Sequence, residues 1–173
     1  MFHADGQLKK IALSGGSAVT LCESTRPEGL SWGVDTVFVG ARGSIRRVSA
    51  DGGPLEEVLA GDANQVFTSP HLLPDGRTLL FSRAPLGGPR CWSTRLIRGE
   101  SSVLLEGSTA RYVVPGYLVY SRPVDTASWA IVAAPFDRSL LEVSGEPKAL
   151  VEGLADNTQL PSPLLGCSRT CRR

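Results

Sequence analysis

The chain has 173 residues, of which 42 % are hydrophobic and 20 % charged, and its formal net charge is +1. This composition is too apolar for a disordered chain, and charge this close to neutral, without a basic face, excludes binding driven by phosphate neutralisation. The 19 glycines and 12 prolines favour short strands and turns over helices.

Export and membrane segments are not expected in this sequence. The first ten residues include His3, Asp5 and two lysines, where a signal peptide needs an apolar stretch. The longest apolar run, Trp129 to Phe136, is much shorter than the roughly 20 residues of a membrane-spanning helix. The chain as it stands is therefore expected to be cytoplasmic, and periplasmic only as part of a longer protein that carries a leader.

The first expected element is a pair of strands at 8–13 and 18–21, joined by the turn Ser14-Gly15-Gly16. Glycine reaches positive φ without steric cost, so the turn predicts a hairpin. No strand is expected before this pair. Residues 1–26 are therefore predicted to be the two outer strands of an incomplete blade.

Three complete units are expected to follow, at 27–62, 63–108 and 109–154. The second unit has strands at 29–32, 36–39, 44–49 and 55–59, with Asp51-Gly52-Gly53 before the last. The third has strands at 70–73 and 78–82 around Pro74-Asp75-Gly76-Arg77, and a last strand at 102–105 after Arg98-Gly99-Glu100. The fourth has strands at 110–114, 117–121 and 130–134, and a last strand at 148–151 after Ser144-Gly145-Glu146.

The turn phrase before each last strand is the informative repeat. Its middle glycines, Gly15, Gly52, Gly99 and Gly145, recur at intervals of roughly 40 to 50 residues, the length of a four-stranded propeller blade. No window of helical length shows an apolar stripe with helical spacing. The sequence thus predicts an all-β protein with almost no helix.

The last part of the chain, 155–173, departs from this pattern. Gln159 to Arg173 contains Pro-Ser-Pro, Cys167, Cys171 and terminal arginines, with no strand pair and no turn phrase. We interpret it as an irregular tail produced by a truncation or a shifted reading frame.

The segment from Pro70 to Phe81, with its Pro-Asp-Gly turn between two strands, resembles the signature of TolB-like (WD40-like, PD40) β-propeller repeats. Similarity extends through 45–53 and 130–153, and it covers roughly Leu8 to Asn157. The sequence looks like the propeller region of bacterial serine/threonine protein kinases. The resemblance implies a partial, open β-propeller of about three four-stranded blades plus half a blade.

By analogy, the resemblance implies a non-catalytic interaction or sensing module that binds a protein or a small ligand across the propeller face. The alternative is the regulatory propeller of an enzyme whose catalytic domain lies outside the chain, either a serine/threonine kinase or, less favoured, a prolyl-oligopeptidase-type peptidase. Nucleic acid is not an expected partner. An open arc leaves blade edges unsealed, so self-association and poor solubility are expected.

Catalytic, cofactor and metal sites are not expected in this chain. The motifs of kinases and the Gly-x-Ser-x-Gly elbow of hydrolases are absent from the sequence. His71, with Ser69 nearby, is a candidate general base, and Asp75 is a candidate cation ligand. A structural histidine and a turn aspartate that bonds its own backbone explain these residues more simply.

Cysteines and tryptophans complete the candidates. Cys22, Cys91, Cys167 and Cys171 are too dispersed for a disulfide scaffold and lack a second cluster for zinc. We interpret Trp32, Trp92 and Trp129 as residues that pack between blades, with ligand stacking as the other reading.

Overall fold

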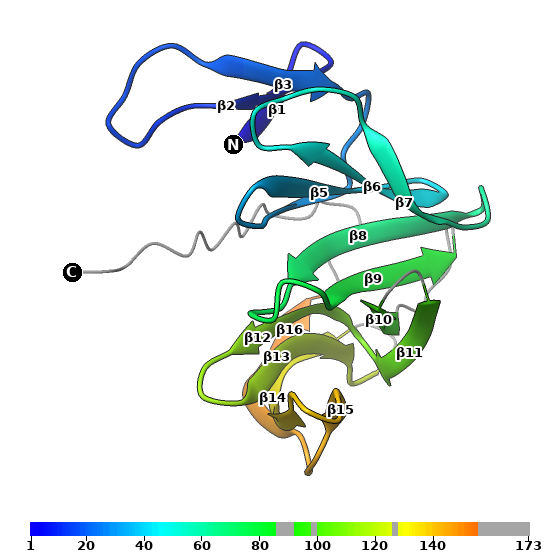
Figure 1. The fold of residues 1–173 in the computed structure, drawn as a ribbon. Coiled ribbons are helices and arrows are strands. Elements are labelled where there is room, and N and C mark those ends of the chain that lie inside the picture. Colours follow the sequence, from blue (N-terminus) through cyan, green and yellow to red (C-terminus); the bar gives the residue numbers. More distant parts are fainter. Residues whose placement is uncertain (86–91, 98–99, 126–127, 156–173) are drawn as a thin grey trace.

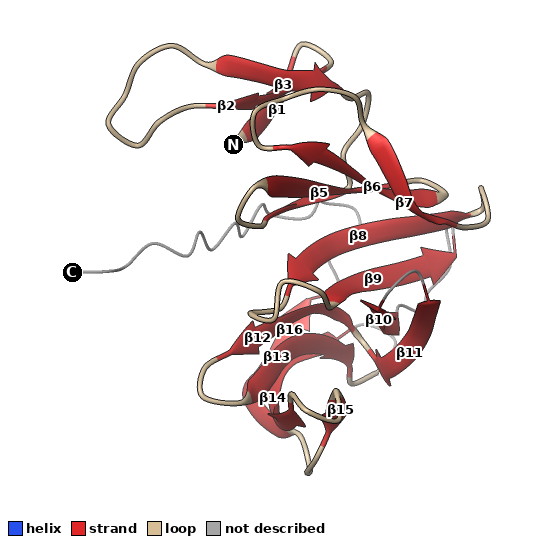
Figure 2. Cartoon of the chain, in the orientation of Figure 1, coloured by secondary structure: helices blue, strands red, loops and turns tan. Residues whose placement is uncertain are grey.

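The computed structural model describes residues 1–85, 92–97, 100–125 and 128–155, with the backbone alone for 92–97 and 155. Every regular element within these ranges is a strand, which confirms the all-β prediction (Figure 2). The strands form four antiparallel sheets, and each sheet takes a continuous stretch of the chain (Figure 1). Of the irregular tail expected at 155–173, Ala155 ends a strand, and 156–173, with Cys167 and Cys171, lies outside the described residues, as does Cys91.

The first sheet has three strands, β1 (Phe2–Ala4), β2 (Gln7–Lys10) and β3 (Val19–Glu23). The expectation of only two strands here is wrong. Asp5 and Gly6 both have positive φ, 54° and 71°, and join β1 to β2 in a tight hairpin. An Asp-Gly pair is a typical two-residue hairpin turn, because both of its central positions need positive φ.

The second and third sheets have four strands each, in sequence order. The second contains β4 (Gly29–Trp32), β5 (Thr36–Ala41), β6 (Ser44–Ser49) and β7 (Glu56–Ala60). The third contains β8 (Gln65–Leu72), β9 (Leu79–Pro85), β10 (Trp92–Ile97) and β11 (Glu100–Glu106).

The fourth sheet is built from β12 (Ser108–Val113), β13 (Tyr117–Pro123), β14 (Ser128–Asp137), β15 (Glu142–Val143) and β16 (Lys148–Ala155). β14 pairs with both β15 and β16. The short strand β15 occupies part of the long connection that precedes Ser144-Gly145-Glu146. It is an addition that the other sheets do not show within the described residues.

Two of the predicted glycine turns lie in hairpins between the last two strands of a sheet. Gly15 and Gly16 lie between β2 and β3, and Gly52 and Gly53 lie between β6 and β7, all with positive φ. In the fourth sheet the phrase follows β15 and precedes β16. Arg98 and Gly99, in the third unit, fall outside the described residues.

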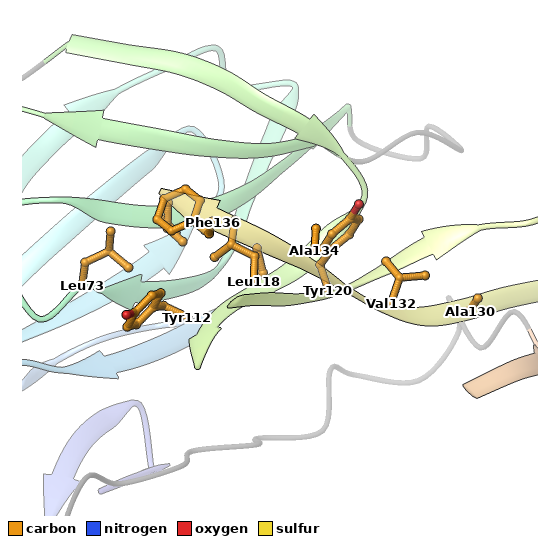
Figure 3. Packing of buried hydrophobic residues seen from close by; sticks show 10 residues of the cluster. Leu73, Tyr112, Leu118, Tyr120, Ala130, Val132, Ala134 and Phe136 are labelled. Atoms are coloured by element: carbon orange, nitrogen blue, oxygen red, sulfur yellow. The ribbon is translucent and has the colours of Figure 1, made fainter. Parts of the chain in front are cut away.

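The hydrophobic core is divided among the spaces between successive sheets. Alternation along β5 shows how: Val37 and Val39 pack toward the first sheet, and Phe38 between them packs toward the third. The cluster between the third and fourth sheets is the largest (Figure 3). Its buried members are Leu73, Leu80, Ala110, Tyr112, Leu118, Tyr120, Ala130, Val132, Ala134 and Phe136.

Candidate binding site at the inner strands

The first strands of the complete sheets lie beside one another. β8 contacts both β4 and β12, and each of these strands is paired on only one side within its own sheet. The open side of each strand therefore presents backbone groups that need other partners. We call β4, β8 and β12 the inner strands.

Three polar side chains hold the same place on the inner strands. Ser31, His71 and Arg111 pair with Phe38, Leu80 and Val119, which occupy equivalent positions of the second strands. We call Ser31, His71 and Arg111 the inner row.

Two members of the inner row bind the main chain of β8 from opposite sides. The Leu72 N–H of β8 donates to Ser31 Oγ at 3.3 Å. Arg111 donates from one guanidinium nitrogen to the carbonyls of Ser69, at 2.8 Å, and Pro70, at 3.1 Å. The inner row thus joins the second, third and fourth sheets.

A bulge precedes the inner row on β8 and on β12. The register shifts between Thr68 and His71 and between Ser108 and Arg111, and Ser69 and Thr109 have positive φ, 51° and 56°. A bulge bends its strand and redirects the side chains that follow. The bulge on β12 lets the Thr109 N–H donate to Ser82 Oγ in the third sheet, with 2.8 Å between nitrogen and oxygen.

The guanidinium of Arg111 lies half-buried against the main chain of β8. Burial lowers the pKa of Arg111, although the group stays protonated at any ordinary pH. None of the ion pairs in the described part of the chain involves it. Both of the acceptors within hydrogen-bond distance are neutral carbonyls, so no carboxylate among the described side chains balances its charge.

His71, the candidate general base, and its neighbour Ser69 lie on either side of Pro70 in β8. Ser69 is buried and its carbonyl accepts from Arg111, whereas His71 is half-buried in the inner row. The structure therefore places Ser69 in the contact between the third and fourth sheets, while the role of His71 stays a prediction.

Asp75 has its oxygens committed to its own turn. Oδ1 accepts from the Arg77 and Thr78 N–H groups, both at 2.9 Å, and Oδ2 accepts from Thr78 Oγ1 at 2.6 Å. Partial burial acts to raise the pKa of Asp75, but the hydrogen bonds from Thr78 and Arg77 outweigh it and the pKa is lowered. This arrangement agrees with the turn-aspartate interpretation.

Trp32 lies at the rim between the first and second sheets, on the face of β4 whose partner Val37 packs toward the first sheet. It is 44 % exposed, because β4 ends at Trp32 and the chain reverses at Gly33. The indole lines a half-open hollow of about 370 Å³ together with Met1, Lys10, Ile11, Ala12, Ser17 and Val19. Trp129 is half-buried on β14, and the side chain of Trp92 lies outside the described residues.

Comparison with solved structures shows what this arrangement is. The chain is similar to TolB from Acinetobacter baumannii, with a TM-score of 0.65 and 18 % identity over 84 % of this chain and 37 % of that one. It is similar to a calcium-binding protein, regucalcin, from Agrobacterium tumefaciens, with a TM-score of 0.61 and 10 % identity over 84 % and 52 %. It also resembles a chain of a nidogen/laminin complex, with a TM-score of 0.57 and 19 % identity over 88 % and 59 %.

The fold is an open β-propeller. All three of these structures are β-propellers, and this chain spans less than two thirds of each. No protein-family model matches the sequence, and no curated protein is detectably similar to it. The PD40 repeat family and a link to protein kinases therefore remain predictions from the sequence.

Among the described residues of the propeller, no group of three or more His, Cys, Asp and Glu side chains is arranged to hold a metal ion. No helix there is long and apolar enough to cross a bilayer. Cys22 is a free, buried thiol.

The residue that sequence reasoning missed is Arg111. Arg111 is the one charged residue in the otherwise apolar strand Ala110-Arg111-Tyr112-Val113-Val114. Arg and Lys are almost never buried without a partner, so a lone arginine in an apolar strand predicts a specific contact.

Proposed function

We propose that this propeller is a non-catalytic interaction module whose inner row binds a carboxylate of a protein partner or a small ligand. The single observation that carries the proposal is Arg111, a half-buried cation that no described acidic side chain balances. Buried charges are normally paired, because desolvation of an isolated ion is costly. A ligand carboxylate would supply the missing negative charge.

The guanidinium retains donors for such a ligand. One terminal nitrogen of Arg111 donates hydrogen bonds to both the Ser69 and the Pro70 carbonyls. The other terminal nitrogen and Nε make no hydrogen bond to the described residues, and together they form the fork that can hold a carboxylate with two parallel bonds. The main-chain contacts hold this fork in place before a ligand arrives, which reduces the entropy lost on binding.

The proposal can be tested by nuclear magnetic resonance of the arginine Nε–H groups, with sodium acetate as the probe. We expect the Arg111 signal to shift saturably with acetate and to stay in place with sodium chloride at equal ionic strength. Arg122, which is exposed on β13, is the matched internal control. An Arg111 response no larger than that of Arg122 would refute the carboxylate site.

A second candidate function is the regulatory propeller of a larger enzyme, a serine/threonine kinase or a peptidase. The observation that favours it is the coverage of 37 to 59 % of the matched propellers, which suits a portion of a longer protein. Sequencing the flanking gene distinguishes the candidates. A kinase or α/β-hydrolase domain in frame with this chain would support the enzyme, and stop codons on both sides would support a separate binding module.

A further inference from the structure

A hollow opens between the first and second sheets at the point where β4 ends. Its volume is about 370 Å³, and Trp32, Ile11 and Val19 form much of its apolar lining. Each of these three side chains is between 44 % and 51 % exposed. The volume is in the range of pockets that take a small ligand or one large side chain. We call this cavity the Trp32 hollow.

Apolar side chains continue from the Trp32 hollow onto the two connections beside it. Every residue of the β2–β3 connection from Ile11 to Ala18 is exposed, and none of them is charged (Figure 1). Leu13 on this connection is 94 % exposed, and Val34 on the β4–β5 turn is 87 % exposed. These are the two most exposed large hydrophobic side chains of the described residues. Exposed apolar groups beside a tryptophan are typical of a surface that binds a protein.

The charges beside the Trp32 hollow are negative on balance. The Ala50 carbonyl accepts from Lys10 Nζ at 2.5 Å, and the Ala50 N–H donates to the Asp35 carbonyl at 2.9 Å. Lys10 also forms an ion pair of 3.8 Å with Asp51, whose side chain is 98 % exposed. The exposed side chain of Asp35, three residues after Trp32, has no ion pair or hydrogen bond with a described residue. Two carboxylates therefore accompany a single ammonium group.

We infer that the Trp32 hollow takes a large apolar side chain of a partner polypeptide that carries lysine or arginine next to it in sequence. The apolar side chain covers Trp32, and the basic neighbours meet the carboxylates of Asp35 and Asp51. The face of an indole also attracts a cation. Lys10 does not favour an anionic ligand instead, because its ammonium already binds a main-chain carbonyl and an aspartate. The site shares no residue with the inner row.

Nuclear magnetic resonance of the tryptophan indole N–H groups tests this site in the full chain. No N-terminal tag is added, because Met1 also lines the hollow. Trp32→Phe assigns the Trp32 signal, and the half-buried Trp129 is the internal reference. The probes are the acetylated and amidated tripeptides Lys-Phe-Lys, Glu-Phe-Glu and Lys-Gly-Lys.

We expect the Trp32 signal to shift saturably with Lys-Phe-Lys and to stay in place with the other two peptides. An equal response to Glu-Phe-Glu would show that charge does not select the ligand, and an equal response to Lys-Gly-Lys would show charge attraction alone. Either result, or no response to any of the three peptides, would overturn the inference.

A matched pair of variants tests the contribution of the carboxylates. Asp35→Asn removes one charge beside the hollow and keeps the shape of the side chain. Because an exposed charge pair contributes little, we expect the affinity for Lys-Phe-Lys to fall by about twofold to fivefold. Asp62→Asn, exposed on the β7–β8 connection at the other end of the second sheet, should bind as the wild type does. Equal affinities of the two variants would contradict a basic partner.

Phosphatidylcholine vesicles test a membrane as the occupant, since an exposed and uncharged loop also suits a lipid surface. We expect the Trp32 signal to remain unchanged when vesicles are added. Loss of this signal with vesicles, and its recovery in Leu13→Ser, would identify a lipid surface as the occupant and overturn the inference.

Discussion

Gly29 of β4 lies directly against the main chain of Ser69 in β8. A β-carbon at Gly29 would be 2.6 Å from the Ser69 nitrogen and 3.0 Å from Pro70 Cδ. Backbone atoms cannot rotate away as a flexible side chain can. The contact therefore sets how closely the second and third sheets approach at their inner strands.

Gly29→Ala should destabilise the protein by about 1 to 3 kcal/mol, the usual cost of overpacking a tight contact. Urea unfolding followed by circular dichroism measures this loss. Ala60→Ser on the exposed outer strand β7 is the control and should change stability by less than about 0.5 kcal/mol. A neutral Gly29→Ala variant would show that the two strands can separate freely.

Leu80→Ala should remove one of the central side chains between the third and fourth sheets. Leu80 is fully buried and packs in the cluster with Leu73, Tyr112 and Leu118. The transfer and cavity costs together predict a loss of about 2 to 5 kcal/mol in the free energy of unfolding. The variant is therefore expected to melt well below the wild type. Equal melting temperatures would contradict the assignment of this cluster as a core.

Arg111→Met should weaken the junction between β12 and β8. The variant keeps the aliphatic length but loses the two hydrogen bonds to the carbonyls of Ser69 and Pro70. Hydrogen bonds from a charged donor predict a loss of about 2 kcal/mol. Arg122→Met, on the exposed side of β13, is the control and should be nearly neutral. Equal stability of the two variants would exclude a structural role for Arg111.

Asp75 should contribute stability that depends on pH. Its pKa is lowered in the folded protein, so the contribution is present above the unfolded value of about 3.9 and is lost as pH falls through the folded pKa. Asp75→Asn should cost about 1 kcal/mol at pH 7, the typical net value of an exposed hydrogen bond. The difference from the wild type should shrink below about pH 4, as measured by urea unfolding at several pH values. A difference that grows on acidification would contradict the predicted sign.

Cys22 should be unreactive in the folded protein. Burial raises the pKa of its thiol, so both the thiolate fraction and reagent access are low. In a chain with the other cysteines changed to serine, labelling by a thiol reagent should be slow in buffer and should accelerate as urea unfolds the first sheet. Rapid labelling in buffer would show that the first and second sheets separate in the native state.

The strand order and the inner strands could be predicted because local signals agree with the global fold. The predicted strands at 29–32 and 44–49 match β4 and β6, since turn residues bound both. The Pro-Asp-Gly turn likewise marks the end of β8 and the beginning of β9. Propeller blades repeat these signals, so each occurrence supports the others.

The errors come from short or long-range features. β1 has only three residues and no alternation to read, although the Asp5-Gly6 turn beside it was a usable hairpin signal. The partial exposure of Trp32 depends on where β4 ends relative to the neighbouring sheet, which sequence spacing does not show. Arg111 finds its acceptors in another sheet, 41 and 42 residues away in the sequence.

The inner row also determines how the arc can bend. The hydrogen bonds that Ser31 accepts and Arg111 donates connect neighbouring blades along their inner strands. Bending between blades would therefore pivot about the inner strands and widen the gap between the outer strands first. Amide protons of β7 and β16 should then exchange with solvent sooner than those of β8, and the curvature of the arc would adapt to whatever covers its ends without breaking its inner edge.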